Sequence, residues 1–593
     1  MTSFARDLPF GATLLDPGRT RFRLWAPGQP AVAVDVEGPG VVPMTRDAAG
    51  WFEAEALCGA GTRYRYRLAD GLAVPDPASR AQGRDVHDPS LVVDPRAYRW
   101  RHPDWRGRKW QEAVLYELHA GSLGGFAGVA ARLPDLAELG ITAVELMPVN
   151  DFPGQRNWGY DGVLPFAPDT AYGAPDDLKA LVDAAHGLGL MIFLDVVYNH
   201  FGPDGNYLAA YAPGFFRTDI ATPWGAAIDF RQPEVRRFFT ENALYWLMEY
   251  RFDGLRFDAV HAIAAPDWLD EMAAEVRATV EPGRHVHLVL EHDGNVADHL
   301  RQGFDAQWND DAHHVLHVLL TGEADGYYAD YADRPAERLA RCLGEGFAYQ
   351  GEPSGYRKGE PRGTPSADLS PSAFVMFLQN HDQVGNRPFG DRLGERVDAA
   401  ALEAAIALQL LCPQIPLIFM GEEGASRAPF LFFTDHHGDL AKAVREGRRR
   451  EFAAFKGFHD GETADSIPDP NALATFESSH PLADDANRRA LYRRLLALRA
   501  AALAPHLSGA RSISAKAAGP ACVAARWRLG NGAVLALVSN LGRADCAVDP
   551  PEGDLLFESR AGASEVLRAG RLTGPATVAF LDSAAKSSAK GNG

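Results

Sequence analysis

The feature that most restricts the fold of this chain is an alternation of short apolar runs with longer helical segments. The runs lack the polar–apolar alternation of a half-exposed strand, and they lie at residues 113–118, 141–149, 190–197, 254–260, 286–291, 304–308, 373–379 and 415–421. Strands that are apolar on both faces belong in a parallel sheet covered by helices. Spacers such as residues 128–140 carry apolar side chains at intervals of three and four and end on glycine. Eight such units over about 350 residues predict an α/β fold, a (β/α)8 TIM barrel, rather than an open doubly wound sheet.

The segments on either side of the barrel do show the alternation that the barrel strands lack. It occurs in residues 19–27, 31–36, 51–56 and 62–71, and again in 521–530 and 533–542. This pattern is typical of antiparallel sheets with one solvent-facing side. We therefore expect an N-terminal β-sandwich with a linker (75–104) in residues 1–104, a barrel with a helical extension in 105–504, and a C-terminal β-domain in 505–593. The last residues, 583–593, are expected to be disordered.

Charge and cysteine content restrict the partners of the chain. Its 59 basic and 78 acidic side chains give a formal net charge of −19, which repels phosphate backbones and anionic lipids. We therefore expect neither nucleic acid nor a membrane as a partner. The 5 cysteines are scattered and none lies in a CxxC pair, so their spacing predicts no disulfide framework and no zinc site. Because the start of the chain does not resemble a secretory signal, the sequence predicts a reduced, cytoplasmic protein.

Charged side chains and histidines cluster at the ends of four apolar runs, where a TIM barrel builds its active site. They are Asp195, His200, Arg256, Asp258, Glu291, His381 and Asp382. Buried like charges are costly, so their convergence indicates either catalysis or a metal site. No HxH or HExxH spacing occurs at these strand ends, and Arg256, two residues from Asp258, would repel a cation. The pattern therefore favours acid–base chemistry on a neutral substrate.

Four of these segments resemble the signature regions of the α-amylase family of glycoside hydrolases. They are, in order, DVVYNH (195–200), GLRFDAVHA (254–262), LEHD (290–293) and QNHDQVGN (379–386). The resemblance spans most of residues 112–480, and it implies an immunoglobulin-like or carbohydrate-binding sandwich before the barrel. Three further segments resemble the trehalose-releasing hydrolases of that family: DFPGQRNWGYDG (151–162), GEEGASRAPFLFFTDHH (421–437) and GRRREF (447–452). Taken alone, the aromatic run FLFF (430–433) is as typical of a buried strand or helix edge as of a functional segment.

The resemblance implies roles for three carboxylates: Asp258 as nucleophile, Glu291 as general acid/base and Asp382 as stabiliser of the transition state. This division of labour fits the chemistry, because a glycosidic oxygen is a poor leaving group that needs a proton. A carboxylate on the opposite face captures the oxocarbenium-like centre, and water then releases the sugar with net retention. We expect Arg256 to keep Asp258 ionised, and the crowding of negative charge to raise the pKa of Glu291.

The same resemblance implies substrate contacts around these carboxylates. Tyr160 matches an aromatic platform for the sugar, and Asp195 is expected to orient Arg256 rather than to react. For Asn309, Asp310 and His313, helix capping is the alternative. The expected substrate-binding residues are Tyr160, His200, Arg256, His261, Asn309, Asp310, His313, His381, Gln383 and Asn386.

The implied activity is retaining hydrolysis of the α-1,4 bond next to the terminal trehalose of malto-oligosyltrehalose, with related α-glucans as further ligands. The third apolar run ends at residue 197 and the fourth begins at residue 254. That separation is short for the calcium-carrying inserted domain of many α-amylases, so we expect no required metal and no cofactor. Two alternatives remain: a 1,4-α-glucan branching enzyme of similar architecture, and a non-catalytic glucan-binding protein on a decayed barrel. The presence of all three carboxylates argues against the second.

Overall fold

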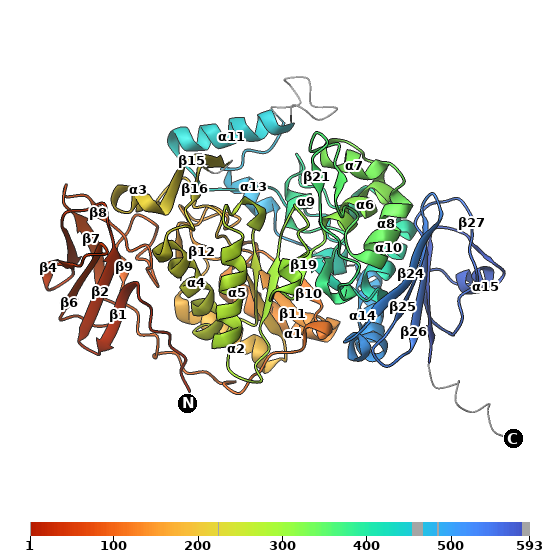
Figure 1. Cartoon of the computed structure of the whole chain (residues 1–593), viewed down its shortest axis with the longest axis horizontal. Helices are drawn as coiled ribbons and strands as arrows, with labels where there is room; N and C mark the ends of the chain where they lie inside the picture. Colours follow the sequence, from red (N-terminus) through yellow and green to blue (C-terminus); the bar gives the residue numbers. More distant parts are fainter. Residues whose placement is uncertain (1, 223–224, 453–465, 483–484, 584–593) are drawn as a thin grey trace.

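The computed structural model describes residues 2–222, 225–452, 466–482 and 485–583. Three β-rich regions follow one another along the long axis of the molecule: the N-terminal sheets, a central barrel wrapped in helices, and a C-terminal sheet (Figure 1). The predicted fold class is confirmed by this arrangement, whereas the predicted domain bounds stay a prediction.

Two antiparallel sheets form the N-terminal region, in the orders β1-β2-β6-β5 and β4-β3-β7-β8, with β9 added to β7. Their strands are β1 (Gly11–Asp16), β2 (Arg19–Trp25), β3 (Val32–Val36), β4 (Gly40–Pro43), β5 (Thr45–Arg46), β6 (Trp51–Ala56), β7 (Arg63–Leu68), β8 (Ala73–Val74) and β9 (Ser90–Leu91). Phe22 and Tyr64 pack between the two sheets with their ring centroids 4.8 Å apart. The segment 75–104, predicted as a linker, supplies β9 and buries Asp76 and Ser79 completely.

Eight parallel strands close the central barrel in sequence order, and each predicted run supplies one of them. They are β10 (Leu115–Leu118), β11 (Ala143–Leu146), β14 (Met191–Val196), β17 (Gly254–Phe257), β18 (His287–Leu290), β19 (Ala306–Trp308), β22 (Phe374–Met376) and β23 (Ile415–Phe419). The register pairs Glu117 with Glu145 and Asp195 with Arg256, so polar residues of neighbouring strands lie side by side. The barrel interior is therefore polar towards the end at which the strands finish.

Helices cover the outside of the barrel. They include α1 (Gly125–Leu139), α2 (Pro175–Gly187), α4 (Pro233–Met248), α5 (Asp267–Thr279), α6 (Asp310–Thr321), α8 (Pro335–Glu345), α10 (Ala399–Leu411) and α14 (Ala486–Leu498). The first of them shows why they form: Phe126, Val129, Leu133 and Leu136 recur at helical spacing and are fully buried. This helix ends at Gly140, whose φ of 106° is a left-handed conformation that favours glycine.

Between the third and fourth barrel strands the chain forms α3 (Leu208–Tyr211) and a small hairpin of β15 (Phe216–Thr222) and β16 (Gly225–Ile228) before α4. A separate helix, α11 (Gly438–Phe452), lies across the top of the molecule in the view of Figure 1, on the same side as this hairpin. Both elements lie outside the barrel wall.

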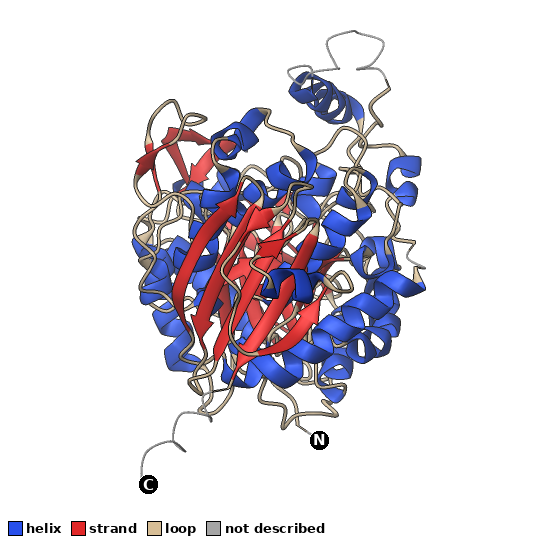
Figure 2. Cartoon of the chain, turned by 90° about the vertical axis from the view of Figure 1, so that its right-hand side faces the viewer, coloured by secondary structure: helices blue, strands red, loops and turns tan. Residues whose placement is uncertain are grey.

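A five-stranded antiparallel sheet of order β24-β25-β26-β30-β28 closes the described chain, and Figure 2 shows it in front of the barrel. Its strands are β24 (Arg511–Gly519), β25 (Cys522–Arg528), β26 (Val534–Asn540), β28 (Asp554–Glu558) and β30 (Ala576–Asp582). The short strands β27 (Cys546–Ala547) and β29 (Arg571–Leu572) pair beside it, next to α15 (Ala563–Arg568).

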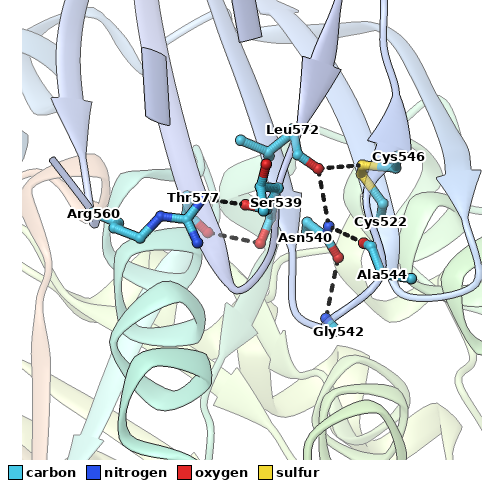
Figure 3. The surroundings of a disulfide bond; sticks show 10 residues. Cys522, Ser539, Asn540, Gly542, Ala544, Cys546, Arg560, Leu572 and Thr577 are labelled. Carbon is cyan, nitrogen blue, oxygen red and sulfur yellow. Dashed lines mark hydrogen bonds between the residues drawn. A yellow bond between two sulfur atoms is a disulfide. The ribbon is translucent and has the colours of Figure 1, made fainter. Parts of the chain in front are cut away.

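A disulfide joins Cys522 to Cys546 in this region, with Leu572 and Asn540 beside it (Figure 3). The prediction that the cysteines form no disulfide is therefore wrong for this pair. The two residues are 24 positions apart in the sequence. They meet because β27, which carries Cys546, pairs with β29 beside the sheet, and the spacing of the cysteines does not predict that pairing. The other three cysteines are free and buried.

None of the helices in the described part of the chain combines the length and the apolar character that a bilayer crossing requires. The end that was predicted to be disordered, residues 583–593, lies outside the described residues except for Ser583.

Candidate active site

Arg256 lies at the centre of the polar cluster at the ends of the barrel strands. It is fully buried on β17, and its guanidinium lies 4.1 Å from the centroid of the Trp308 ring. Nη1 donates to Asp195 Oδ2 at 2.6 Å and to Asp258 Oδ1 at 2.9 Å. Nη2 donates to Glu291 Oε2 at 2.8 Å. One guanidinium thus holds carboxylates from the ends of β14, β17 and β18, and the structure brings together the residues that the sequence placed at these strand ends.

The hydrogen bonds of Asp258 and Glu291 reverse their expected order of pKa. Glu291 Oε2 also accepts a bond from the Ala259 N–H at 2.8 Å, whereas Asp258 shares Nη1 of Arg256 with Asp195. Burial raises the pKa of Glu291, but Arg256 and the Ala259 N–H outweigh burial and lower it. Burial and the charge of Glu291 raise the pKa of Asp258 well above its usual range. Both directions are opposite to the expectation that Arg256 keeps Asp258 ionised and that crowding raises the pKa of Glu291.

Asp382 lies in the first turn of α9 (His381–Gly385), which follows β22. Its backbone N–H donates to the capping side chain of Asn380 at 2.9 Å. Its Oδ1 accepts from Asn386 Nδ2 at 3.1 Å and lies 3.5 Å from His381 Nε2. The side chain is 36% exposed, against 12% for Asp258 and 18% for Glu291. Asp382 is therefore the most accessible carboxylate of the trio.

Glu117 is a buried partner of this site that the sequence reasoning missed. It lies on β10, and its Oε1 and Oε2 accept bonds from His381 Nδ1 at 2.5 Å and from the His381 backbone N–H at 3.0 Å. Burial disfavours the imidazolium, but the charges of Asp382 and Glu117 outweigh it and raise the pKa of His381 to about 9. The signal in the sequence is a single carboxylate one residue before the end of an apolar run, LYEL, which itself ends on leucine.

This contact leads to a pH-dependent stability. The pKa of His381, about 9 when folded, exceeds the value of about 6.5 that is usual for histidine. The resulting stabilisation, at most about 3 kcal/mol, is fully present below about pH 6.5 and is lost as the pH rises through 9. We expect Glu117→Gln to lower the Tm most near pH 6 and much less above pH 9. A pH-independent loss of Tm would contradict this; the control is Glu145→Gln, the same change at the paired position on β11.

Tyr160 contacts Asp195, and His200 contacts Tyr160. The Tyr160 hydroxyl donates to Asp195 Oδ2 at 2.6 Å, and its ring stacks on His381 with centroids 5.1 Å apart and planes 21° apart. His200 Nε2 donates to the Tyr160 carbonyl at 3.0 Å, and burial lowers the pKa of His200 to about 4. A neutral His200 and a stacked Tyr160 form an uncharged edge of the site, as a neutral sugar requires.

Two of the expected contacts are part of the supporting framework. Asn309 caps α6, with its Oδ1 accepting from the Ala312 N–H at 3.2 Å and its Nδ2 donating to the Gly346 carbonyl at 2.8 Å. The capping alternative therefore describes its contacts. His313 is fully buried, and its Nδ1 donates to the Leu378 carbonyl at 2.8 Å.

The remaining expected contacts are Asp310, His261 and Gln383, besides Asn386. Burial and the charge of Glu291 raise the pKa of Asp310 well above its usual range. His261 is exposed, with its ring centroid 6.2 Å from that of His292. Gln383 Oε1 accepts from the Asn380 N–H at 3.0 Å, which completes the cap of α9.

A pocket of about 350 Å³ adjoins Asp382. Gln383 and Asn386, which follow Asp382 in the chain, contribute to it. Its other lining side chains are mainly aromatic (Tyr327, Tyr328, Phe389 and Phe452) and charged (Glu323, Asp325, Arg387, Asp391, Arg396 and Glu451). The sequence reasoning missed Tyr327 and Phe389, because neither belongs to a recognisable motif. Within the described residues, no group of three or more His, Cys, Asp or Glu side chains is arranged to hold a metal ion.

Comparison with known proteins adds to this geometry. The chain matches the model of the alpha amylase catalytic domain over residues 93–212 and that of a domain of unknown function, DUF3459, over residues 510–581. It is 44% identical over 508 residues to the malto-oligosyltrehalose trehalohydrolase of Deinococcus radiodurans, covering 82% of each chain. It is 41% identical over 461 residues to the enzyme of that name from Saccharolobus solfataricus, covering 75% of this chain and 80% of the relative. A crystal structure assigned as an alpha amylase from Salmonella typhimurium matches with a TM-score of 0.91 and 44% identity, over 97% of this chain and 100% of that one.

Proposed function

Since this chain belongs to the malto-oligosyltrehalose trehalohydrolase family, we propose that it hydrolyses the α-1,4-glucosidic bond next to the terminal trehalose of malto-oligosyltrehalose. The products are trehalose and a malto-oligosaccharide, a step of trehalose biosynthesis. The observation that carries the proposal is the joint placement of Asp258 and Glu291 on the guanidinium of Arg256. Retaining glycoside hydrolysis needs two carboxyl groups close together, one for each face of the bond.

The reaction assigns one event to each carboxyl. Glu291 donates its proton to the glycosidic oxygen as the bond to the leaving trehalose breaks. Asp258, ionised, forms an ester with the anomeric carbon. Water then attacks that carbon, gives a proton back to Glu291 and releases Asp258 as carboxylate. This assignment requires the proton to reside on Glu291 when the substrate is bound, whereas in the free site the pKa of Asp258 is raised and that of Glu291 is lowered.

Two features favour a neutral sugar in this site. Tyr160 offers a ring on which a pyranose face packs while its hydroxyls stay free to bond, and the neutral His200 lies against the Tyr160 backbone. The pocket beside Asp382 has the size of a small-molecule site, for which about 300–1,000 Å³ is usual. We place the leaving trehalose there, in the pocket that Tyr327 and Phe389 help to line.

Incubation with malto-oligosyltrehalose is expected to release free trehalose, with the new reducing end appearing first as the α-anomer because the mechanism retains configuration. Chromatography of the products and proton NMR of the anomeric signals measure both results. Plain malto-oligosaccharide of equal length is the matched substrate, and equal cleavage of it would reject the preference for the trehalose end. Amylose treated with the enzyme and stained with iodine tests the branching alternative, which requires new α-1,6 links.

We also propose that the enzyme works in the cytoplasm, on α-glucans and without nucleic acid or membrane partners. The net charge of −19 supports the absence of nucleic acid and membrane partners. Three of the five cysteines, Cys58, Cys342 and Cys412, are free, as is usual in a reducing compartment, and the Cys522–Cys546 disulfide is the exception to that pattern. Recovery of the native protein outside the cytosolic fraction of its cells would reject that location.

A further inference from the structure

One arginine of helix α11 points towards the active site. The helix lies outside the barrel, at the top of Figure 1, and contains the segment GRRREF. Its side chains differ greatly in exposure: Arg448 is 9% exposed, whereas Arg450 is 72% exposed. The burial of Arg448 comes from contacts with residues that also surround Asp382.

The contacts of Arg448 form a chain that ends on Asp382. Its Nη2 donates to the Gly385 carbonyl, at the end of α9. Its Nη1 donates to Asn386 Oδ1 at 3.3 Å, and Asn386 Nδ2 in turn donates to Asp382 Oδ1 at 3.1 Å. A guanidinium carries only donors, so it can face only the oxygen of the Asn386 amide. The amide nitrogen is thereby directed at the Asp382 carboxylate.

The guanidinium of Arg448 also packs against two aromatic rings. It lies 5.3 Å from the ring centroid of Phe432 and 4.4 Å from that of Phe452. Phe432 packs edge-on against Trp158, whose ring contacts His381 at 5.4 Å. Two segments singled out in the sequence, FLFF and GRRREF, therefore meet at this arginine.

Arg448 lies directly behind one wall of the pocket beside Asp382. Asn386, Glu451 and Phe452 all line that pocket. Arg448 contacts each of them, and its bond from Nη1 to Glu451 Oε2 measures 3.0 Å. The same side chain thus connects the orientation of a carboxylate to the shape of the adjoining pocket.

We propose that Arg448 is a positioning residue for this reaction: through Asn386 it orients Asp382, and with Phe432 and Phe452 it holds the pocket wall. The inference rests on the proposed function, because it assigns Asp382 to the transition state and the pocket to the leaving sugar. Lysine cannot replace arginine here, since a single ammonium lacks the planar fork that reaches the Gly385 carbonyl, Asn386 and Glu451 together.

The test is a double-mutant cycle of Arg448→Ala and Asn386→Ala, measured as kcat/KM on malto-oligosyltrehalose. We expect each single variant to lose about tenfold or more, mainly in kcat, and the double variant to lose clearly less than the product of the two single losses, because Arg448 acts on Asp382 through Asn386. Arg448→Lys is expected to resemble Arg448→Ala. Arg450→Ala, on the exposed side of the same helix, is the matched control and should stay near wild type.

Losses that multiply in the double variant, or full activity of Arg448→Lys, would overturn the inference. Circular dichroism and Tm establish that each variant is folded, and Arg448→Lys carries the test if Arg448→Ala is not. Failure of the proposed function is recognised separately, because the wild type would then release no trehalose. If the wild type cleaves plain malto-oligosaccharides instead, the same cycle on those substrates still tests Arg448.

Discussion

Asp258→Asn is expected to lower kcat on malto-oligosyltrehalose by about four orders of magnitude or more while leaving substrate binding nearly intact. The amide has almost the shape of the carboxyl but cannot form the glycosyl ester. Arg256 remains held by Asp195 and Glu291, so the site keeps its framework. Turnover is measured by trehalose release, and binding by calorimetry with the same substrate.

The matched control for this change is Glu145→Gln, again a carboxyl converted to an amide inside the barrel. Glu145 is buried on β11, and burial together with the charge of Glu117 raises its pKa well above the usual range. A protonated carboxyl and an amide are both neutral, so activity should stay within about twofold of wild type. Turnover of Asp258→Asn close to that of this control would remove the nucleophile from Asp258.

Glu291→Gln is expected to lose about three orders of magnitude or more on malto-oligosyltrehalose, but far less on a substrate whose leaving group needs no proton. An α-malto-oligosyl fluoride is such a substrate, because fluoride leaves without protonation. Initial release of fluoride, followed with a selective electrode, reports the first step alone. Asp258→Asn, in contrast, should be inactive on both substrates, since its defect is in bond formation to the sugar.

The pair of substrates separates the two roles. Equal losses of Glu291→Gln on the fluoride and on malto-oligosyltrehalose would show that Glu291 does not supply the proton. Added azide provides a further check, because an anionic nucleophile replaces water without help from a general base and should restore part of the turnover.

The barrel could be predicted because its strands are buried on both faces and therefore stand out as continuous apolar runs. The edge strand β24 was missed for the opposite reason: its side chains are mostly exposed or half-buried, and RSISAKAAG carries little apolar pattern. The pairing of Cys522 with Cys546 depends on how β27 returns to the sheet, which no local signal specifies.

The candidate site was predictable where its residues end strands, as for Asp258 and Glu291. Glu117 was missed because its importance lies in a partner 264 positions away, His381. The order of the two pKa values could not be inferred either, since it depends on the Ala259 N–H facing Glu291 rather than on the kinds of residue present.

The position of Arg256 has a consequence for any attempt to retune the enzyme to another pH. Asp195, Asp258 and Glu291 have this one cation as a common neighbour, so protonating any of them changes the field felt by the other two. Titration of such a group yields apparent constants that belong to the ensemble rather than to a residue. A substitution intended to shift only the acidic or only the alkaline side of the pH–activity profile will therefore shift both sides. The practical targets are the residues around Arg256, such as Trp308, and around its carboxylate partners, such as Tyr160.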